Sequence, residues 1–260
     1  PLTRMENLKH VLYRRIRDTK FPPPIPPADL RLGVEDNRRW FARQGQRFDW
    51  REVSAFALYA LWITGRQDEA HAFVRTFAQL GATVFRVLAT LDGGYWTETA
   101  RQLTGRSCRC APDMPGYWEE WPSFLSAMAA EGTYIRVCLL GAVEPFGGVW
   151  HPDRRDVWSG DVRRRGEDFA ARLAEVVGAF PNVVIEIANE PGQIGMRDSF
   201  SALVHLGRRV KSAAPETVLF GGSVDGSNDQ DTTFCVRPFD AVDAHIERRM
   251  QMFGFGWVKR

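Results

Sequence analysis

The chain has 260 residues, of which 44% are hydrophobic and 25% charged, and its formal net charge at pH 7 is +2. These proportions are those of an ordinary globular protein. The small net charge gives no indication of a nucleic-acid partner. No stretch of about 18 apolar residues occurs, so the sequence predicts no membrane-spanning helix. The length suits one large domain or two small ones.

The first part of the chain, residues 1–38, reads as a peripheral segment that precedes the main domain of residues 39–260. Its apolar residues suggest one short helix, and the run F-P-P-P-I-P-P at 21–27 predicts an extended connector. Residues 39–42 and 47–50 then read as two short strands around a turn at Gln44 and Gly45.

The main domain alternates predicted strands with predicted helices. We expect strands at 53–59, 83–89, 133–140, 183–188, 217–222 and 239–246, and helices at 68–80, 118–130, 166–180 and 200–213. This alternation predicts a parallel α/β sheet. A doubly wound open sheet would give the same alternation. No glycine-rich phosphate loop follows the first strand, however, so a nucleotide site is not indicated.

The most informative stretch is P-N-V-V-I-E-I-A-N-E-P, residues 181–191. A short, β-branched apolar run bounded by prolines predicts a buried strand of a parallel sheet. Asn189 and Glu190 stand at its carboxyl end, which is where ligands bind in such sheets. The alternative is a plain turn, in which Asn189 caps the next segment and Glu190 is solvated.

This ending resembles the strand-four motif of the clan A glycoside hydrolases, which are retaining β-glycosidases with (β/α)8 TIM barrels. The resemblance implies that Glu190 is the acid/base and that Asn189 hydrogen-bonds the sugar 2-hydroxyl. It also implies that Arg86, in F-R-V of the second strand, lies near the nucleophile and binds substrate. The alternative for Arg86 is an ion pair with a structural acid such as Glu186, since a charge inside an apolar strand needs a partner.

The resemblance leaves one part of the catalytic site unassigned. The family's nucleophile ends strand seven, whereas six strands are accounted for by Ile246. A barrel of this type needs eight strands to close. We therefore expect an incomplete (β/α)8 barrel of about six βα units, part of a longer protein, that is inactive alone. Glu247 is a weak candidate for the nucleophile, on topology alone.

Further candidates for substrate binding lie in loops and at one strand end. The resemblance places a histidine at the end of strand six, where His245 stands, although a structural role is equally open. Aromatic side chains are the expected platforms for sugar rings. Trp96 and Trp150 are preferred because glycine-rich neighbours suggest exposed loops, although any single aromatic residue can instead be packing. Asp92 and Glu144 follow strand ends, where they bind hydroxyls or cap the next segment.

Metal and cofactor chemistry is not indicated. The five histidines show no metal-ligand spacing, and Cys108 and Cys110 stand in C-R-C, which is not a usual zinc spacing. Cys138 lies in an apolar strand and is expected to be core. No cofactor is predicted, and the cellular compartment stays open.

The sequence thus favours a glycoside hydrolase-like barrel that acts on an oligosaccharide or polysaccharide with β-linkages. One alternative is a non-catalytic carbohydrate-binding barrel that has lost the nucleophile. Another is an unrelated α/β enzyme in which Asn-Glu-Pro is accidental. No nucleic acid or membrane partner is expected.

Overall fold

The computed structural model describes most of the chain from residue 31 onwards. The described residues are 31–35, 40–92, 109–148, 157–191, 195–196, 199–224, 238–244, 251–253 and 256–258. The expected N-terminal helix and proline-rich connector lie outside these ranges.

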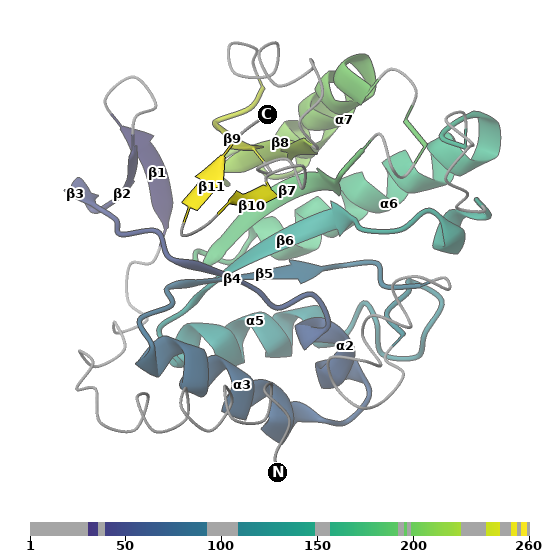
Figure 1. The fold of residues 1–260 in the computed structure, drawn as a ribbon. Coiled ribbons are helices and arrows are strands. Elements are labelled where there is room, and N and C mark those ends of the chain that lie inside the picture. The colour runs from purple at the N-terminus through teal and green to yellow at the C-terminus, as the bar shows by residue number, and fades with distance from the viewer. Residues whose placement is uncertain are drawn as a thin grey trace.

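A six-stranded parallel sheet forms the centre of the described structure (Figure 1). Its strands run in chain order, each parallel to the next: β4 (Glu52–Ser54), β5 (Val84–Leu88), β6 (Tyr134–Leu140), β7 (Val183–Asn189), β8 (Leu219–Val224) and β9 (Ala241–Ala244). A doubly wound sheet reverses its strand order, whereas a barrel does not. The strictly sequential order therefore confirms the expected incomplete (β/α)8 barrel and excludes the open sheet.

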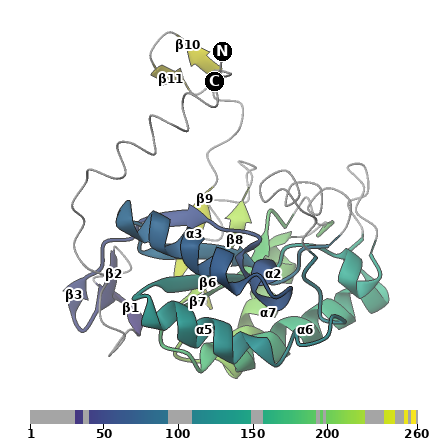
Figure 2. The same cartoon turned by 90° about the horizontal axis from the view of Figure 1, so that it is seen from below.

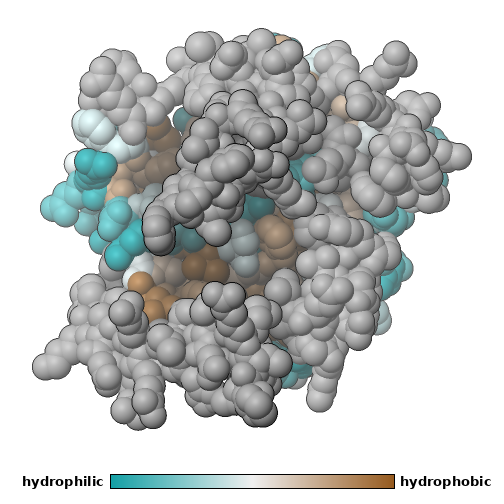
Figure 3. Space-filling view, in the orientation of Figure 1, coloured by the Kyte–Doolittle hydropathy of each residue, from teal (hydrophilic) through white to brown (hydrophobic). Residues whose placement is uncertain are grey.

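The helices form an outer layer around this curved sheet (Figures 1 and 2). They are α2 (Leu58–Ile63), α3 (Gln67–Gln79), α5 (Glu120–Ala130), α6 (Gly160–Gly178) and α7 (Ser199–Ala213). Right-handed crossovers between adjacent parallel strands place successive helices on the same side. The opposite side of the sheet becomes the barrel interior, and Figure 3 shows a hollow with hydrophobic residues on its floor.

The central strands are buried on both faces. Every residue of β5, β6 and β7 is buried. Successive side chains alternate between faces, so Phe85, Ile135 and Ile185 join the large core cluster under the helices. Their neighbours Val84 and Tyr134 join a second cluster at the amino ends of the strands. This double burial explains why the strands read as continuous apolar runs.

A small antiparallel sheet closes the amino end of the barrel. It consists of β1 (Leu32–Glu35), β2 (Trp40–Arg43) and β3 (Gln46–Arg47). Gln44 and Gly45 form its turn with φ of 51° and 72°, the left-handed pair that a tight hairpin needs. The expected hairpin is therefore present. The second strand of the hairpin, β3, is shorter than the expected 47–50. The first strand, β2, also pairs with β1 along its other edge.

Aromatic rings in and just after this hairpin pack against the barrel strands. The ring of Phe48 meets Tyr134 of β6 edge-on, with centroids 4.8 Å apart. The rings of Phe41 and Trp50 lie 5.7 Å and 5.5 Å from Phe220 of β8. We call these five residues the aromatic plug. The plug joins the N-terminal hairpin to β6 and β8 of the described sheet.

The first barrel strand is shorter than the sequence indicated. The expected strand 53–59 ends at Ser54, and its second half begins helix α2 at Leu58. An apolar run cannot be assigned to strand or buried helix by periodicity alone. Helix α2 is apolar around its whole circumference because it is enclosed, with Tyr59 stacked on Trp121 of α5 at 3.6 Å.

Helix α6 begins at Gly160 rather than at the expected residue 166. Its first turns carry charges rather than apolar periodicity. Arg163 pairs with Glu167 at 2.6 Å, and Arg164 pairs with Asp161 at 2.9 Å. Such pairs three and four residues apart stabilise a helix without any apolar face, which is why the hydrophobic pattern missed them. The remaining expected helices and strands agree with the structure to within a few residues.

In the part of the chain that the structure describes, no helix is long and apolar enough to cross a bilayer.

Gly141 allows the ends of β5 and β6 to approach closely. A Cβ atom at this position would lie 2.5 Å from the Thr90 carbonyl oxygen, which is backbone and cannot move away cheaply. We therefore expect Gly141→Ala to lower the free energy of unfolding by about 1–3 kcal/mol, measured by urea denaturation. Gly33→Ala is the control, since nothing lies within 4 Å of its added Cβ. Equal effects of the two substitutions would contradict this packing argument.

Candidate active site

Asn189 and Glu190 lie together at the carboxyl end of β7. Asn189 is the last residue of the strand and pairs with Ser223 of β8. Both side chains belong to buried residues, with exposed fractions of 3% and 6%. The solvated turn that the sequence left open is therefore excluded for Glu190. The strand presents a carboxyl and a carboxamide group side by side within the fold.

The backbone of Glu190 is in a left-handed conformation, with φ of 43°. Among the described non-glycine residues, Gln44 shares this feature, and it lies in a hairpin turn. Glutamate is not a residue that favours this region, and non-glycine residues held there are often found at functional sites. Pro191, which follows, ends the strand.

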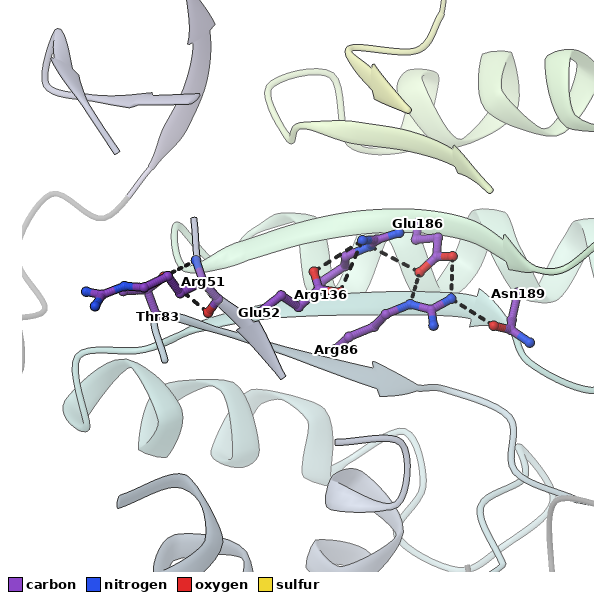
Figure 4. Close-up of polar contacts among 7 residues, drawn as sticks. All are labelled: Arg51, Glu52, Thr83, Arg86, Arg136, Glu186 and Asn189. Carbon is purple, nitrogen blue, oxygen red and sulfur yellow. Dashed lines mark hydrogen bonds and ion pairs between the residues drawn. The ribbon is translucent and has the colours of Figure 1, made fainter. Parts of the chain in front are cut away.

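Arg86 of β5 and Glu186 of β7 form a buried, two-bonded ion pair (Figure 4). Arg86 Nε donates to Glu186 Oε2 at 2.7 Å, and Arg86 Nη2 donates to Oε1 at 2.6 Å. The side chains are 2% and 0% exposed. Charges this deeply buried require close pairing, and parallel hydrogen bonds between guanidinium and carboxylate provide it. The ion pair with Glu186, left open by the sequence, is present.

The same guanidinium also contacts the site at the end of β7. Arg86 Nη2 donates a further hydrogen bond to Asn189 Oδ1 at 2.9 Å (Figure 4). Arg86 therefore contacts both an ion-pair partner within the barrel and the carboxamide beside Glu190. The structure brings together Arg86, Asn189 and Glu190, three residues that the sequence singled out.

A second guanidinium extends this network toward the amino end of the barrel. Arg136 of β6 approaches Glu186 Oε2 with its Nε at 3.1 Å and Glu52 of β4 with its Nη1 at 3.2 Å. Its guanidinium also lies over the ring of Phe220, 4.2 Å from the centroid. The inner wall thus holds two arginines and two glutamates in alternation, so their charges balance.

Arg136 and Glu52 belong to this network although the sequence pattern did not single them out. The signal was present, because Arg136 interrupts the apolar strand Y-I-R-V-C-L-L as Arg86 interrupts its own. Sheet register makes Arg86 and Arg136 neighbours. Two adjacent buried arginines require a carboxylate that both can reach, and Glu186 has that position.

The described cysteines are plain core residues. Cys110 and Cys138 are free and buried. Burial raises the pKa of both thiols well above the ordinary value, and the nearby Glu186 carboxylate adds to this effect on the Cys138 pKa. Such thiols stay protonated and unreactive, so Cys138 has the core role that its strand predicted.

The two acids after strand ends have local partners. Arg109 pairs with Asp92 at 2.9 Å, and the backbone N–H of Val143 donates to Glu144 Oε2 at 3.1 Å. Glu144 is the first residue of a short 3-10 helix, η1 (Glu144–Phe146), whose N-cap residue is Val143.

Several sequence candidates lie outside the described residues. These are His245, Trp96, Trp150, Glu247 and Cys108. The described tryptophans of the same loops are packing residues: Trp121 is fully buried, and Trp118 lies under the Arg172 guanidinium at 3.9 Å. Within the described ranges, no group of three or more His, Cys, Asp or Glu residues could hold a metal ion.

Comparison with known proteins identifies the fold. No protein-family model matches the sequence, and no curated protein matches it. Solved structures do match. A protein titled glycoside hydrolase superposes with a TM-score of 0.58 at 16% identity over 90% of this chain. The chain has the fold of a glycoside hydrolase barrel.

Two further structures with this glycoside hydrolase fold agree. A cellulase gives a TM-score of 0.56 at 14% identity over 86% of the chain. A family 5 glycoside hydrolase from Bacteroides vulgatus gives 0.54 at 14% identity over 84%. The chain spans 51%, 64% and 44% of these three structures, respectively. It therefore covers less than two thirds of the length of each.

The left-handed backbone conformation of Glu190 should affect the free energy of unfolding of variants at this position. Glycine adopts this conformation freely, whereas alanine does so at a cost of about 1 kcal/mol. Both substitutions remove the carboxyl group, so we expect Glu190→Gly to be more stable than Glu190→Ala by about 1 kcal/mol in urea unfolding.

The same pair of substitutions at Glu175, on the exposed face of α6, is the matched control. In a helix the order reverses, and Glu175→Ala is expected to be the more stable by about 1 kcal/mol. Greater stability of Glu190→Ala over Glu190→Gly would contradict the left-handed strain at Glu190.

Proposed function

We propose that this chain is the greater part of the catalytic barrel of a retaining glycoside hydrolase that acts on a β-linked oligosaccharide or polysaccharide. The observation that carries the proposal is the buried pair of Asn189 and Glu190 at the carboxyl end of β7, where Arg86 of β5 donates a hydrogen bond to Asn189. Catalytic residues of (β/α)8 enzymes lie at this end of the barrel. The glycoside hydrolase fold supports the proposal.

Glu190 is the general acid and then the general base. Cleavage of a glycosidic bond requires a proton on the leaving oxygen, and hydrolysis of the resulting intermediate requires removal of a proton from water. One carboxyl group serves both steps in turn, because the first step leaves it deprotonated. A largely buried carboxyl such as Glu190, 6% exposed, suits the protonated starting state.

Asn189 binds the sugar 2-hydroxyl beside the scissile bond. Its Oδ1 accepts the hydrogen bond from Arg86, so its Nδ2 group is the end that can donate to a sugar oxygen. Hydrogen bonds to this hydroxyl strengthen as the sugar ring approaches the transition state. Arg86 takes part in substrate binding through this contact. His245, Trp96 and Trp150 are proposed to line the substrate site.

The second carboxylate of a retaining mechanism is the nucleophile, and we assign it to no residue of the printed sequence. A retaining site holds the two carboxyl groups about 5–5.5 Å apart.

We therefore expect the isolated 260-residue chain to release no product from any member of a panel of aryl β-glycosides, when assayed by release of the aryl group. The product of the complete reading frame that contains this chain is expected to be active on at least one of them. Turnover by the isolated chain would place a nucleophile within it and contradict this assignment.

Substitution of Glu190 tests the acid/base assignment in the product of the complete reading frame. Glu190→Gln keeps the shape but cannot exchange a proton, so we expect turnover to fall by about 10²–10⁴-fold, the usual contribution of such a group. Small nucleophiles such as azide should restore activity on substrates with good leaving groups.

Glu175→Gln is the control, because it makes the same chemical change on an exposed helix face. It should leave turnover unchanged. Wild-type turnover by Glu190→Gln would eliminate the proposed role. Sugar binding without turnover in the wild-type protein would instead identify a non-catalytic carbohydrate-binding barrel.

A further inference from the structure

We propose that Glu186 is a positioning residue, which acts through Arg86 to fix the orientation of the Asn189 carboxamide. This inference rests on the proposed function, because it explains how that site keeps its hydroxyl-binding group in place. Glu186 is fully buried and precedes Asn189 by three residues on β7, so we assign it no direct contact with substrate.

Glu186 fixes the orientation of the Arg86 guanidinium. Glu186 takes one hydrogen of Arg86 Nε and one of Nη2 with its two carboxylate oxygens, at 2.7 Å and 2.6 Å. Two parallel bonds fix the plane and the rotation of a guanidinium, which a single bond does not. The second hydrogen of Nη2 then has a fixed direction. It points at Asn189 Oδ1, 2.9 Å away.

Arg86 in turn fixes the orientation of the Asn189 amide. A guanidinium is a donor only, so the Asn189 atom that faces Arg86 must be the oxygen. The carboxamide therefore turns its Nδ2 group away from Arg86, as Figure 4 shows. A ligand atom that approaches Nδ2 must be a hydrogen-bond acceptor, and a sugar hydroxyl oxygen meets that requirement.

Glu186 is itself anchored by Arg136. Arg136 approaches Glu186 Oε2 at 3.1 Å, and Glu52 holds Arg136 from the other side at 3.2 Å. Glu186 thus stays in place independently of any substrate. Glutamine cannot replace it, because a carboxamide offers one acceptor oxygen and turns its own donors toward the donors of Arg86. The guanidinium would then lose its fixed direction.

Glu52 provides a matched control within the same network. Like Glu186, it is a carboxylate bound to an inner arginine, with both oxygens within 3.3 Å of Arg136 Nη1. Glu52 binds Arg136, whereas the hydrogen bonds that lead to Asn189 run from Glu186 through Arg86. A merely structural role for the buried charges predicts that Glu186→Gln and Glu52→Gln behave alike.

The kinetic test compares an aryl β-glycoside with its 2-deoxy analogue in the product of the complete reading frame. The ratio of kcat/KM for the two substrates measures the contribution of the 2-hydroxyl contact. We expect Glu186→Gln to reduce this ratio by about tenfold, the value of one well-oriented hydrogen bond. Glu52→Gln should keep the wild-type ratio even where it lowers thermal stability.

An unchanged ratio in Glu186→Gln, or equal losses in both variants, would overturn the positioning role. If Glu186→Gln does not fold, Glu186→Asp takes its place. Aspartate keeps the charge but is too short to make both bonds, so the ratio should again fall.

A second measurement is independent of activity. Crystal structures of the wild-type protein and both variants give the distance from Arg86 Nη2 to Asn189 Oδ1. We expect it to exceed 3.5 Å in Glu186→Gln and to stay at hydrogen-bond length in Glu52→Gln. An intact bond in Glu186→Gln refutes the inference whether or not the protein cleaves glycosides. Absence of wild-type turnover, by contrast, refutes the proposed enzymatic function and not the positioning.

Discussion

The hydrogen-bonded ion pair of Arg86 and Glu186 is the constraint on which the rest of the inner barrel depends. Removal of one partner from such a buried pair typically costs about 3–5 kcal/mol, because it leaves an unpaired charge. The pair joins β5 to β7 across β6, and Arg136 of β6 approaches the same carboxylate. Three neighbouring strands are thereby fixed in register at one level of the barrel, immediately below Asn189 and Glu190.

The architecture was predictable from the sequence to a large extent, because the central strands are buried on both faces. Double burial makes residues 183–189 and 134–140 read as continuous apolar runs. The same property misled the assignment at the first strand, where an equally apolar run is helix α2. Continuous hydrophobicity reports burial and does not distinguish strand from helix; the distinction came from packing against Trp121.

The site was predictable only where one segment carries it. Asn189 and Glu190 are adjacent in sequence, so the motif and its position at the end of a strand could both be predicted. The contact of Arg86 with Asn189 joins residues 103 positions apart, and the contact of Arg136 with Glu52 joins residues 84 apart. Such contacts follow from sheet register, which the sequence does not specify until the strand order is known.

The aromatic plug has a consequence for the order of folding. Phe41 and Trp50 pack on Phe220, so the amino end of the barrel cannot close until β8 is available. Contacts between such distant segments carry a loop-closure cost before they contribute any stabilisation, and folds rich in them form slowly. During synthesis, the hairpin of β2 and β3 therefore cannot complete its packing until the chain has been made as far as β8. Premature termination before β8 would leave several aromatic rings exposed to water, as targets for chaperones.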